Sequence, residues 1–299
     1  MDGVLVVDKP RGLTSHDVVA VARRVLRETR VGHTGTLDPM ATGVLPLAVG
    51  RATRLVRFLT ASDKDYDATI RFGLATDSYD VTGTPVAESP ARPTLEAVEA
   101  AIDALRGEYL QLPPPYSAKK VAGRRAYELA RANQSIELTP VPVRVPSARL
   151  TRFTGDDADV SLTCSAGFYV RSFAHALGER VGTGACLAAL RRTRSGGFSL
   201  ADAVAWDRLT APGTHAADLP VVPLAHLLPD LPAVTLTAQG RTWVSHGRAV
   251  PPADYDVRPG PALPGSEGWV RLFDAAGTLA ALGQPDGVTG AIRPSVVLL

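Results

Sequence analysis

The chain has 299 residues, of which 45% are apolar and 21% are charged; this predicts about two domains and excludes a wholly disordered chain. It has no run of about 18 to 20 apolar residues, so we expect no transmembrane helix and no membrane partner. Its first residues, Met1-Asp2-Gly3, include no basic region before an apolar one, so we expect no signal peptide. The net charge is +2. The two cysteines form no C-x-x-C pair, which argues against a disulfide framework and favours a reducing compartment, the cytoplasm.

The N-terminal segment predicts a strand, a helix and an irregular loop. Residues 3–8 form a short apolar run that is typical of a buried strand. Ser15 is placed to cap a helix over residues 15–27, where apolar residues recur at helical spacing. Residues 31–43 fit neither period, so we predict a loop there.

Both periods recur in the middle of the chain. The alternation of Tyr66, Ala68, Ile70 and Phe72 predicts a strand with one buried face. Further patterns predict a helix capped by Thr94, a short basic helix over 123–133, a strand around 160–164 and a helix over 171–181. Because these elements do not follow a regular βαβ rhythm, we expect an α+β fold rather than a doubly wound one.

The C-terminal part differs in composition from the rest. Five prolines between residues 211 and 232 predict a linker. Residues 233–299 have short apolar runs and little helical period, which predicts a small all-β module. The expected domains are therefore 1–210, a linker over 211–232, and 233–299.

The charge is distributed unevenly along the chain. Residues 117–152 carry a net charge of +6, and residues 1–60 and 171–194 carry +4 each, whereas residues 61–116 carry −6. Segregation of this kind can build one basic face, which favours a nucleic-acid partner. The alternative is that these charges lie on ordinary solvated helix faces.

One loop has a sequence suited to holding a carboxylate. In Gly-His-Thr-Gly-Thr-Leu-Asp-Pro-Met-Ala-Thr-Gly, residues 32–43, three glycines permit tight turns. Pro39 keeps Asp38 out of the helical region of backbone space. A restrained, partly desolvated carboxylate is what nucleophile or base chemistry needs. The alternative is a simple Asp-Pro turn in a glycine-rich loop.

Three other segments carry candidate residues, each with a plain alternative. Arg171 opens a helix after a strand, with Tyr169 two residues earlier, and can pair with a carboxylate and keep it ionised; the alternative is a surface arginine beside a core tyrosine. Tyr66 can stack on a nucleobase or be a core aromatic. A basic segment can track a phosphate backbone or be a solvated helix; its cations are Lys119, Lys120, Arg124 and Arg125.

Several chemistries lack their sequence motifs. The chain has no G-x-x-x-x-G-K-[ST], no H-E-x-x-H, no H-x-E…P-C-x-x-C, and no G-x-G-x-x-G after a predicted strand. We therefore expect no metal and no organic cofactor.

Taken together, these segments resemble the bacterial tRNA pseudouridine-55 synthase (TruB) family. The resemblance runs in the family's order from Gly3-Val4-Leu5-Val6-Val7-Asp8-Lys9-Pro10 to Leu190-Arg191-Arg192, and the loop over residues 32–43 is its most specific part. The tail over 233–299 resembles a PUA-type RNA-binding domain more loosely, through residues 244–250 and 268–273, which implies a small closed β-barrel.

The resemblance implies a role for each matched position. Asp38 is the catalytic aspartate, Tyr66 stacks on the flipped uracil, and Arg171 pairs with Asp38. Basic residues 117–145 match a thumb-like insertion that closes on RNA. The remaining matches are pocket or RNA-side positions: Tyr169, Leu190, Lys9 and His33.

The implied function is isomerisation of uridine 55 in the TΨC loop of tRNA, with a pseudouridine-synthase-type mixed sheet, tRNA as partner, no cofactor and no obligate protein partner. Two alternatives stay open: a non-catalytic RNA-binding or tRNA-folding protein, and a synthase that acts on another RNA such as ribosomal RNA.

Overall fold

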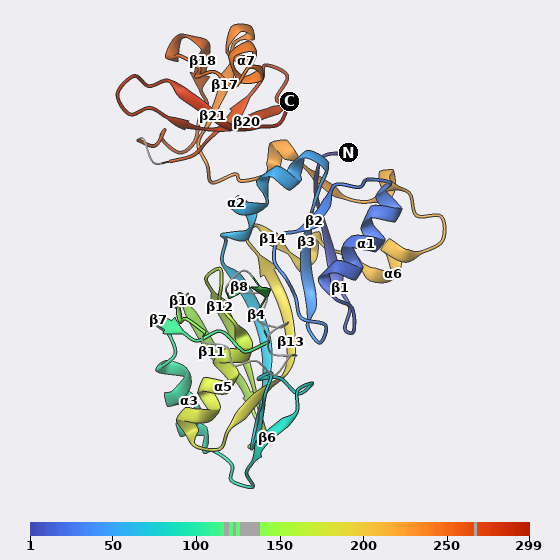
Figure 1. The fold of residues 1–299 in the computed structure, drawn as a ribbon, viewed down its shortest axis with the longest axis vertical. Helices are drawn as coiled ribbons and strands as arrows, with labels where there is room; N and C mark the ends of the chain where they lie inside the picture. The colour runs from blue at the N-terminus through green and yellow to red at the C-terminus, as the bar shows by residue number, and fades with distance from the viewer. Residues whose placement is uncertain (117–119, 122–123, 126–137, 266–267) are drawn as a thin grey trace.

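The computed structural model describes residues 1–116, 120–121, 124–125, 138–265 and 268–299, with the backbone alone at residues 120–121 and 124–125. Its described residues form a long mixed sheet with helices packed on it and a smaller sheet built from the C-terminal part (Figure 1). This arrangement confirms the α+β prediction.

The main sheet runs in the order β11-β12-β4-β13-β3-β1-β15, with β2 added to β3, β14 to β13 and β16 to β1. The pairs β13–β3 and β1–β15 are parallel, and the other pairs are antiparallel. The strands are Gly3–Lys9 (β1), Val31–His33 (β2), Thr42–Val49 (β3), Lys64–Phe72 (β4), Ser147–Phe153 (β11), Asp157–Cys164 (β12), Ala185–Ser195 (β13), Phe198–Ser199 (β14), Val204–Ala205 (β15) and Val221–Pro223 (β16). Residues 31–33 and 42–43 are thus strand, where the sequence predicted loop.

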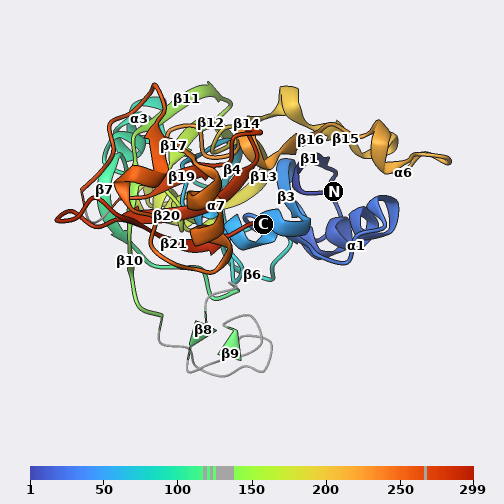
Figure 2. The same ribbon diagram turned by 90° about the horizontal axis from the view of Figure 1, so that it is seen from above.

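Three strand pairs lie outside this sheet. They are β5 (Leu74–Thr76) with β6 (Pro85–Glu88), β7 (Gly107–Gln111) with β10 (Val141–Val145), and β8 (Lys120–Val121) with β9 (Arg124–Arg125). Figure 2 shows β8 and β9 set apart from the main sheet. The basic helix predicted over 123–133 is wrong at Arg124 and Arg125, which pair as strand, and the remainder of that prediction lies outside the described residues.

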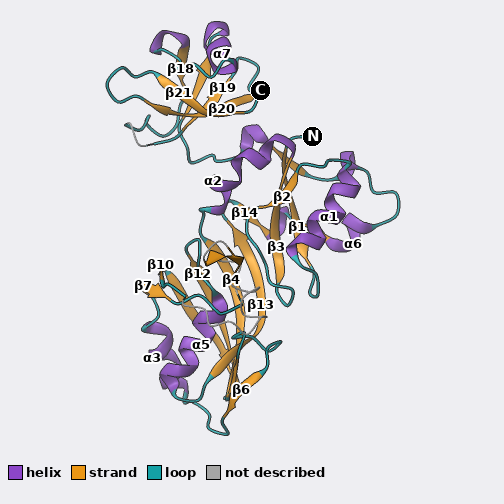
Figure 3. Cartoon of the chain, in the orientation of Figure 1, coloured by secondary structure: helices purple, strands orange, loops and turns teal. Residues whose placement is uncertain are grey.

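Four helices of the main body pack in two pairs (Figure 3). The helices of the described residues are α1 (Ser15–Leu26), α2 (Val56–Thr60), α3 (Leu95–Asp103), α5 (Val170–Val181), α6 (Trp206–Thr210) and α7 (Ala238–Ser245), and the short 3₁₀ turns are Gly50–Leu55, Leu200–Asp202, Ala216–Asp218, Leu224–His226 and Pro252–Asp254. Helices α1 and α6 contact each other near β1 and β2, whereas α3 and α5 pack near β11 and β13. The candidate site uses residues of both pairs, because Ser15 begins α1 and Arg171 lies in the first turn of α5. None of the helices among the described residues is long and apolar enough to span a membrane.

Helix α1 begins differently from the prediction. Thr14 is the N-cap: its hydroxyl accepts from the Asp17 amide, and the Asp17 carboxylate accepts from the Thr14 amide. This reciprocal pair is a capping box, and it leaves the Ser15 side chain free to contact a loop described below. Thr94 caps α3 as predicted.

Each face of the main sheet has its own apolar core. One face packs against α1, α3 and α5 through residues such as Leu5, Leu45, Ile70 and Phe173. The other face, which carries Val4, Val6, Val44 and Ala48, contacts the 50–55 turn and shares a second core with the 50–60 segment, with residues 224–227 and with C-terminal residues. Those residues are Ala233, Phe273, Leu279, Leu282, Val296 and Leu298.

The C-terminal sheet has the order β18-β17-β19-β20-β21, with strands Ala233–Leu236 (β17), Tyr255–Val257 (β18), Val270–Phe273 (β19), Leu279–Pro285 (β20) and Ile292–Val297 (β21). The prediction of an all-β module is wrong at α7, where Gly240 and polar neighbours obscure the helical period. The strand order has two ends among the described residues, so the expected closed barrel is not confirmed.

Part of the proline-rich segment belongs to the main body. Residues 221–223 form β16, which pairs with β1, and Leu224 and Leu227 are buried in the second core. Pro223 ends an edge strand, where its missing N–H costs no ladder hydrogen bond. A reading of residues 211–232 as linker alone therefore fails for this stretch.

Candidate active site

Asp38 lies in the connection between β2 and β3. The Ala41 amide donates to the Asp38 carbonyl (3.0 Å), which closes a tight turn with Pro39 inside it, and the Gly12 amide donates to the Pro39 carbonyl (2.7 Å). Ser15, at the start of α1, accepts from the Leu37 amide (2.9 Å) and donates to the Leu37 carbonyl (3.1 Å). Backbone contacts on both sides thus fix the position of the Asp38 carboxylate, whose side chain is 34% exposed.

Arg171 holds this carboxylate through both of its oxygens. Its Nε lies 2.9 Å from Oδ2, and its Nη2 donates to Oδ1 (3.3 Å). Arg171 stands in the first turn of α5, which follows Tyr169, and the Tyr169 backbone exchanges two hydrogen bonds with the Gln111 side chain. A two-point arginine–carboxylate contact fixes orientation as well as charge. The structure therefore brings Asp38 and Arg171 together, with Tyr169 two residues before Arg171 in the chain.

A second carboxylate lies on the other side of Arg171. Asp80 is 4% exposed, its Oδ2 lies 3.7 Å from Nη1 of Arg171, and its Oδ1 accepts from Ser78 and Thr82. Arg171 also donates to the Ser78 carbonyl (3.1 Å) and the Tyr116 carbonyl (2.8 Å). Our sequence reasoning missed Asp80; a buried acid in a serine- and threonine-rich turn was its only local signal.

Tyr66 is on the buried face of β4, opposite Arg192 of β13. Burial raises the pKa of Tyr66, and the charge of Arg192 and its hydrogen bond act in the opposite direction. Arg192 is 1% exposed and donates to the carbonyls of Val44 (2.7 Å), Gly35 (3.1 Å) and Thr36 (3.4 Å). Arg192 thus links Tyr66 to the loop that carries Asp38, a connection that we did not predict.

Lys9 and His33 are placed beneath and beside this loop. Lys9 is fully buried and donates to the carbonyls of Pro10 (2.9 Å) and Leu13 (2.7 Å); burial lowers its pKa to about 8. A longer contact of 3.5 Å reaches the Pro39 carbonyl of the Asp38 loop. The ammonium is thus bound to backbone carbonyls rather than offered to a ligand. His33 is half-buried at the end of β2, its ring lies edge-on to His16, and burial lowers its pKa.

A cavity of about 450 Å³ adjoins the site. Its apolar floor includes Met40, Ala68, Val160 and Leu190, and its rim is polar. The rim residues are Arg11, Thr42, Asp67, Thr69, Thr151, Asp159 and Arg191. Leu190 therefore lies at a cavity, as expected. The predicted contacts of Lys119, Lys120, Arg124 and Arg125 lie outside the described side chains.

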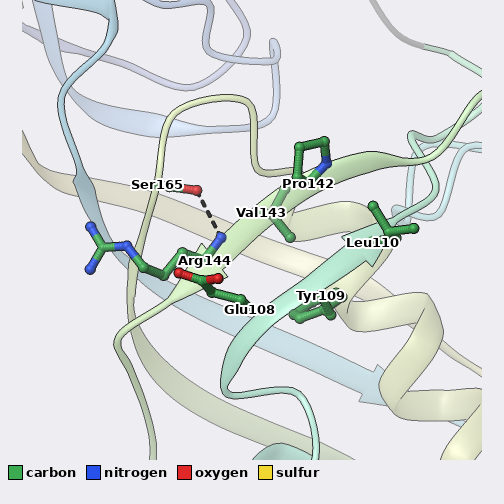
Figure 4. A pocket seen from close by; sticks show the side chains of 7 residues that line it. All are labelled: Glu108, Tyr109, Leu110, Pro142, Val143, Arg144 and Ser165. Carbon is green, nitrogen blue, oxygen red and sulfur yellow. Dashed lines mark hydrogen bonds between the residues drawn. The ribbon is translucent and has the colours of Figure 1, made fainter.

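A second cavity, of about 440 Å³, lies between β7 and β10 (Figure 4). The first cavity is lined by Met40 and Thr42 of the segment that follows Asp38, whereas this one has no residue of that segment in its lining. Its polar contacts are structural: the Arg144 amide donates to the Ser165 hydroxyl (2.9 Å). No group of three potential metal ligands occurs among the described residues.

Solved structures share this architecture. The chain aligns over 99% of its length with 86% of a chain in the archaeal box H/ACA sRNP Nop10–Cbf5 complex, with a TM-score of 0.73 at 24% identity. It aligns with 85% of a chain in a Cbf5–Nop10–Gar1 complex, with a TM-score of 0.72 at 26% identity. The chain therefore shares the fold of the chains aligned in these two complexes.

Sequence comparisons show the family to which the chain belongs. The family model of the TruB pseudouridylate synthase N-terminal domain matches residues 23–170, and that of the tRNA pseudouridylate synthase B C-terminal domain matches residues 171–228. The tRNA pseudouridine synthase B of Solibacter usitatus is 45% identical over 95% of this chain and 96% of its own length. That of Gluconacetobacter diazotrophicus is 41% identical over 96% and 95%. The chain belongs to the TruB family of pseudouridylate synthases.

Proposed function

We propose that the protein converts uridine 55 in the TΨC loop of tRNA to pseudouridine. The observation that supports this most directly is the Asp38 carboxylate, held at both oxygens by Arg171 beside a buried tyrosine, in a chain whose relatives are named tRNA pseudouridine synthase B. The alternative without catalysis gives this ion pair a structural role only, as a link between the Asp38 loop and α5.

The reaction breaks the C1′–N1 bond of the target uridine and forms a C1′–C5 bond. A base within a stacked loop is out of reach, so the nucleotide must first be flipped out. Asp38 can attack C1′, in which case N1 leaves with the bonding electron pair, and the bond from Asp38 to C1′ breaks when C5 attacks. Alternatively, it can take the 2′ proton as N1 leaves, which gives a glycal-like intermediate, and return that proton to C2′ when C5 bonds to C1′. In both routes the base rotates, C5 bonds to C1′, and the C5 proton is lost to a base or water.

The surrounding residues divide the remaining work. Arg171 keeps Asp38 oriented for either route. Tyr66 stays protonated near neutral pH because burial raises its pKa, so it offers a neutral ring for stacking and a hydroxyl for proton transfer. Met40 and Leu190 give the adjoining cavity an apolar wall, which helps to retain a detached base and keep water away.

RNA binding is assigned to other parts of the chain. We propose that the basic insertion over about 117–145 contacts phosphates and that residues 233–299 act as a PUA-like RNA-binding module. The partner is then tRNA, the reaction takes place in the cytoplasm, and neither a cofactor nor an obligate protein partner is required.

A tritium-release assay tests the proposal. Purified protein is incubated with tRNA labelled at C5 of its uridines, and with a matched transcript that carries cytidine at position 55. Release from the first transcript alone is expected. Binding without release supports the non-catalytic alternative. Pseudouridine mapping in a deletion strain tests the other alternative, a synthase that acts on another RNA. Pseudouridines that are lost from ribosomal RNA and not from tRNA would indicate that substrate.

A further inference from the structure

The turn behind Arg171 contains a residue in an unfavourable backbone conformation. Tyr79 has φ of 65°, in the left-handed region that bulky residues rarely adopt. Its neighbours on both sides serve Arg171: the Ser78 carbonyl accepts from Nη1, and the Asp80 carboxylate faces the same nitrogen. A change of backbone at Tyr79 would therefore move two of the groups that hold Arg171.

The Tyr79 ring stacks on His175 of helix α5. The ring centroids are 3.8 Å apart and the planes differ by 5°. His175 follows Arg171 by four residues, so both side chains project from the same face of α5. The helix that carries Arg171 thus also grips the turn that orients it.

The other side of the turn is fixed to β13. The Leu187 amide donates to the Tyr79 carbonyl (2.9 Å), and the Val81 amide donates to the Leu187 carbonyl (3.0 Å). With its backbone tied to β13, the turn can hold the left-handed conformation at Tyr79 as long as the ring has a partner. The imidazole has few other ties: Nε2 lies 3.5 Å from a mostly exposed Glu179 carboxylate, and Nδ1 has no hydrogen-bond partner within the described part of the chain.

We propose that Tyr79 and His175 are a positioning pair that fixes the guanidinium of Arg171 and, through it, the Asp38 carboxylate. The hydrogen bonds and ring contacts of these two side chains among the described residues include none to Asp38, so the pair acts through the turn and Arg171 and not on the substrate. The inference rests on the proposed function for its catalytic consequence, but its structural part stands without it.

Single-turnover isomerisation and tRNA affinity measure the consequence. His175→Ala is expected to lower the rate at saturating enzyme by about three- to tenfold, the range that the loss of one aromatic pair supports, with the tRNA Kd within about twofold of the parent. His175→Phe keeps a ring and should restore the rate. Glu179→Gln is the matched control: it alters the other neighbour of the imidazole, keeps the stack, and should behave as the parent.

A double-mutant cycle separates the pair from a general loss of stability. Tyr79→Gly accepts the left-handed conformation without a stack. In that background, His175→Ala should change the rate by less than about twofold. An effect as large as in the parent background overturns the pairing, as does a His175→Phe variant that is no faster than His175→Ala.

A measurement that does not depend on activity separates the two proposals. In the parent, the Arg171 Nε–H held by Asp38 should exchange slowly in ¹⁵N NMR spectra, and His175→Ala should accelerate that exchange at least about threefold, whereas Glu179→Gln should not. If the parent makes no pseudouridine yet shows this pattern, the proposed function fails and the positioning pair stands. If the parent is active and exchange at Arg171 is unchanged in His175→Ala, the pair is refuted.

Discussion

Replacing Asp38 with alanine tests the assignment of this carboxylate most directly. The substitution removes the group proposed as nucleophile or base, and it removes one of the partners of Arg171. The structure allows these two consequences to be estimated separately. The first concerns the rate of the chemical step, and the second concerns the stability of the fold.

The loss of stability should be small. Arg171 keeps its contacts with Ser78, Tyr116 and Asp80 in the variant, and the lost Asp38 side chain is one-third exposed. A hydrogen bond to a charged group contributes about 1.5 to 3 kcal/mol, and the remaining partners place the loss at the low end, about 1 to 2 kcal/mol. For a chain of this size that corresponds to a decrease in Tm of a few degrees.

The loss of activity should be severe. Removal of a reacting group from an active site typically costs several orders of magnitude in kcat, so we expect a single-turnover rate at least about 10³-fold below the parent. Affinity for tRNA should change little, because phosphate contacts elsewhere dominate binding. The effect should therefore fall on kcat and not on Kd.

Asp157→Ala is the matched control. Asp157 makes a two-point pair with Arg71 at 3.0 and 3.2 Å and has a side chain of similar exposure, 30%, outside the site. It should lose comparable stability and keep its activity. Circular dichroism, filter binding and single-turnover isomerisation on each preparation provide the comparison. A folded Asp38→Ala protein that binds tRNA and works within tenfold of the parent would falsify the assignment.

Further perturbations address other parts of the chain. Tyr66→Phe keeps a ring and should retain tRNA affinity, whereas Tyr66→Leu should lose at least about tenfold in single-turnover rate through lost stacking; near-parental rates in both would return Tyr66 to a core role. Burial lowers the pKa of Lys9 from its ordinary 10.5 to about 8, so between these pH values the unfolded state binds more protons than the folded state. The free energy of unfolding of the parent, measured relative to that of Lys9→Met, should therefore increase as pH rises, by up to about 1.4 kcal/mol per pH unit. Urea unfolding at about pH 8 and pH 10 checks the sign, and a constant difference contradicts it. Neutralising four cations of the insertion should weaken tRNA binding and flatten its salt dependence in filter binding, and an unchanged slope would remove the segment from the interface; the cations are Lys119, Lys120, Arg124 and Arg125. Truncation after Pro232 should remove the module's share of the second core and the Trp269 ring that packs edge-on against Phe58. The apolar side chains of the body that become exposed should each cost about 1.5 to 3 kcal/mol, so the shortened chain should melt several degrees lower or aggregate; a parental melting temperature would show that the C-terminal module does not support the body.

The parts of the site that the sequence could predict are governed by short-range patterns. Proline restricts Asp38 directly, alternation places Tyr66 on the buried face of its strand, and the change from strand to helix places Arg171 at a helix start. Each of these properties depends on a few consecutive residues. Local reasoning therefore reached them, and the family resemblance assigned them roles.

Asp80 and Arg192 were out of reach for the opposite reason. Arg192 stands in a run of cations, Arg191 to Arg194 with one threonine, that is typical of an exposed strand edge. It is buried because strand pairing places it opposite Tyr66 and because carbonyls of the Asp38 loop and of β3 accept hydrogen bonds from its guanidinium. Asp80 is likewise defined by Arg171, which lies far along the chain. No local period encodes either partnership.

The second covering layer of the main sheet did leave a signal in the first strand. Residues 3–7 are apolar without alternation, and since successive side chains of a strand point to opposite faces, such a run predicts burial on both. The helices cover the face of Leu5 and Val7, whereas Val4 and Val6 lie in a second core with residues of the 50–60 segment and of the C-terminal module. Because an all-apolar strand requires two covering layers, the one-sided helices of an α+β fold leave a second face that another part of the chain must bury. The 3₁₀ turn over 50–55 contacts both β1 and β3, and the module joins the same apolar core, so the apolar run of β1 indicates that a second layer exists but does not indicate which segment supplies it.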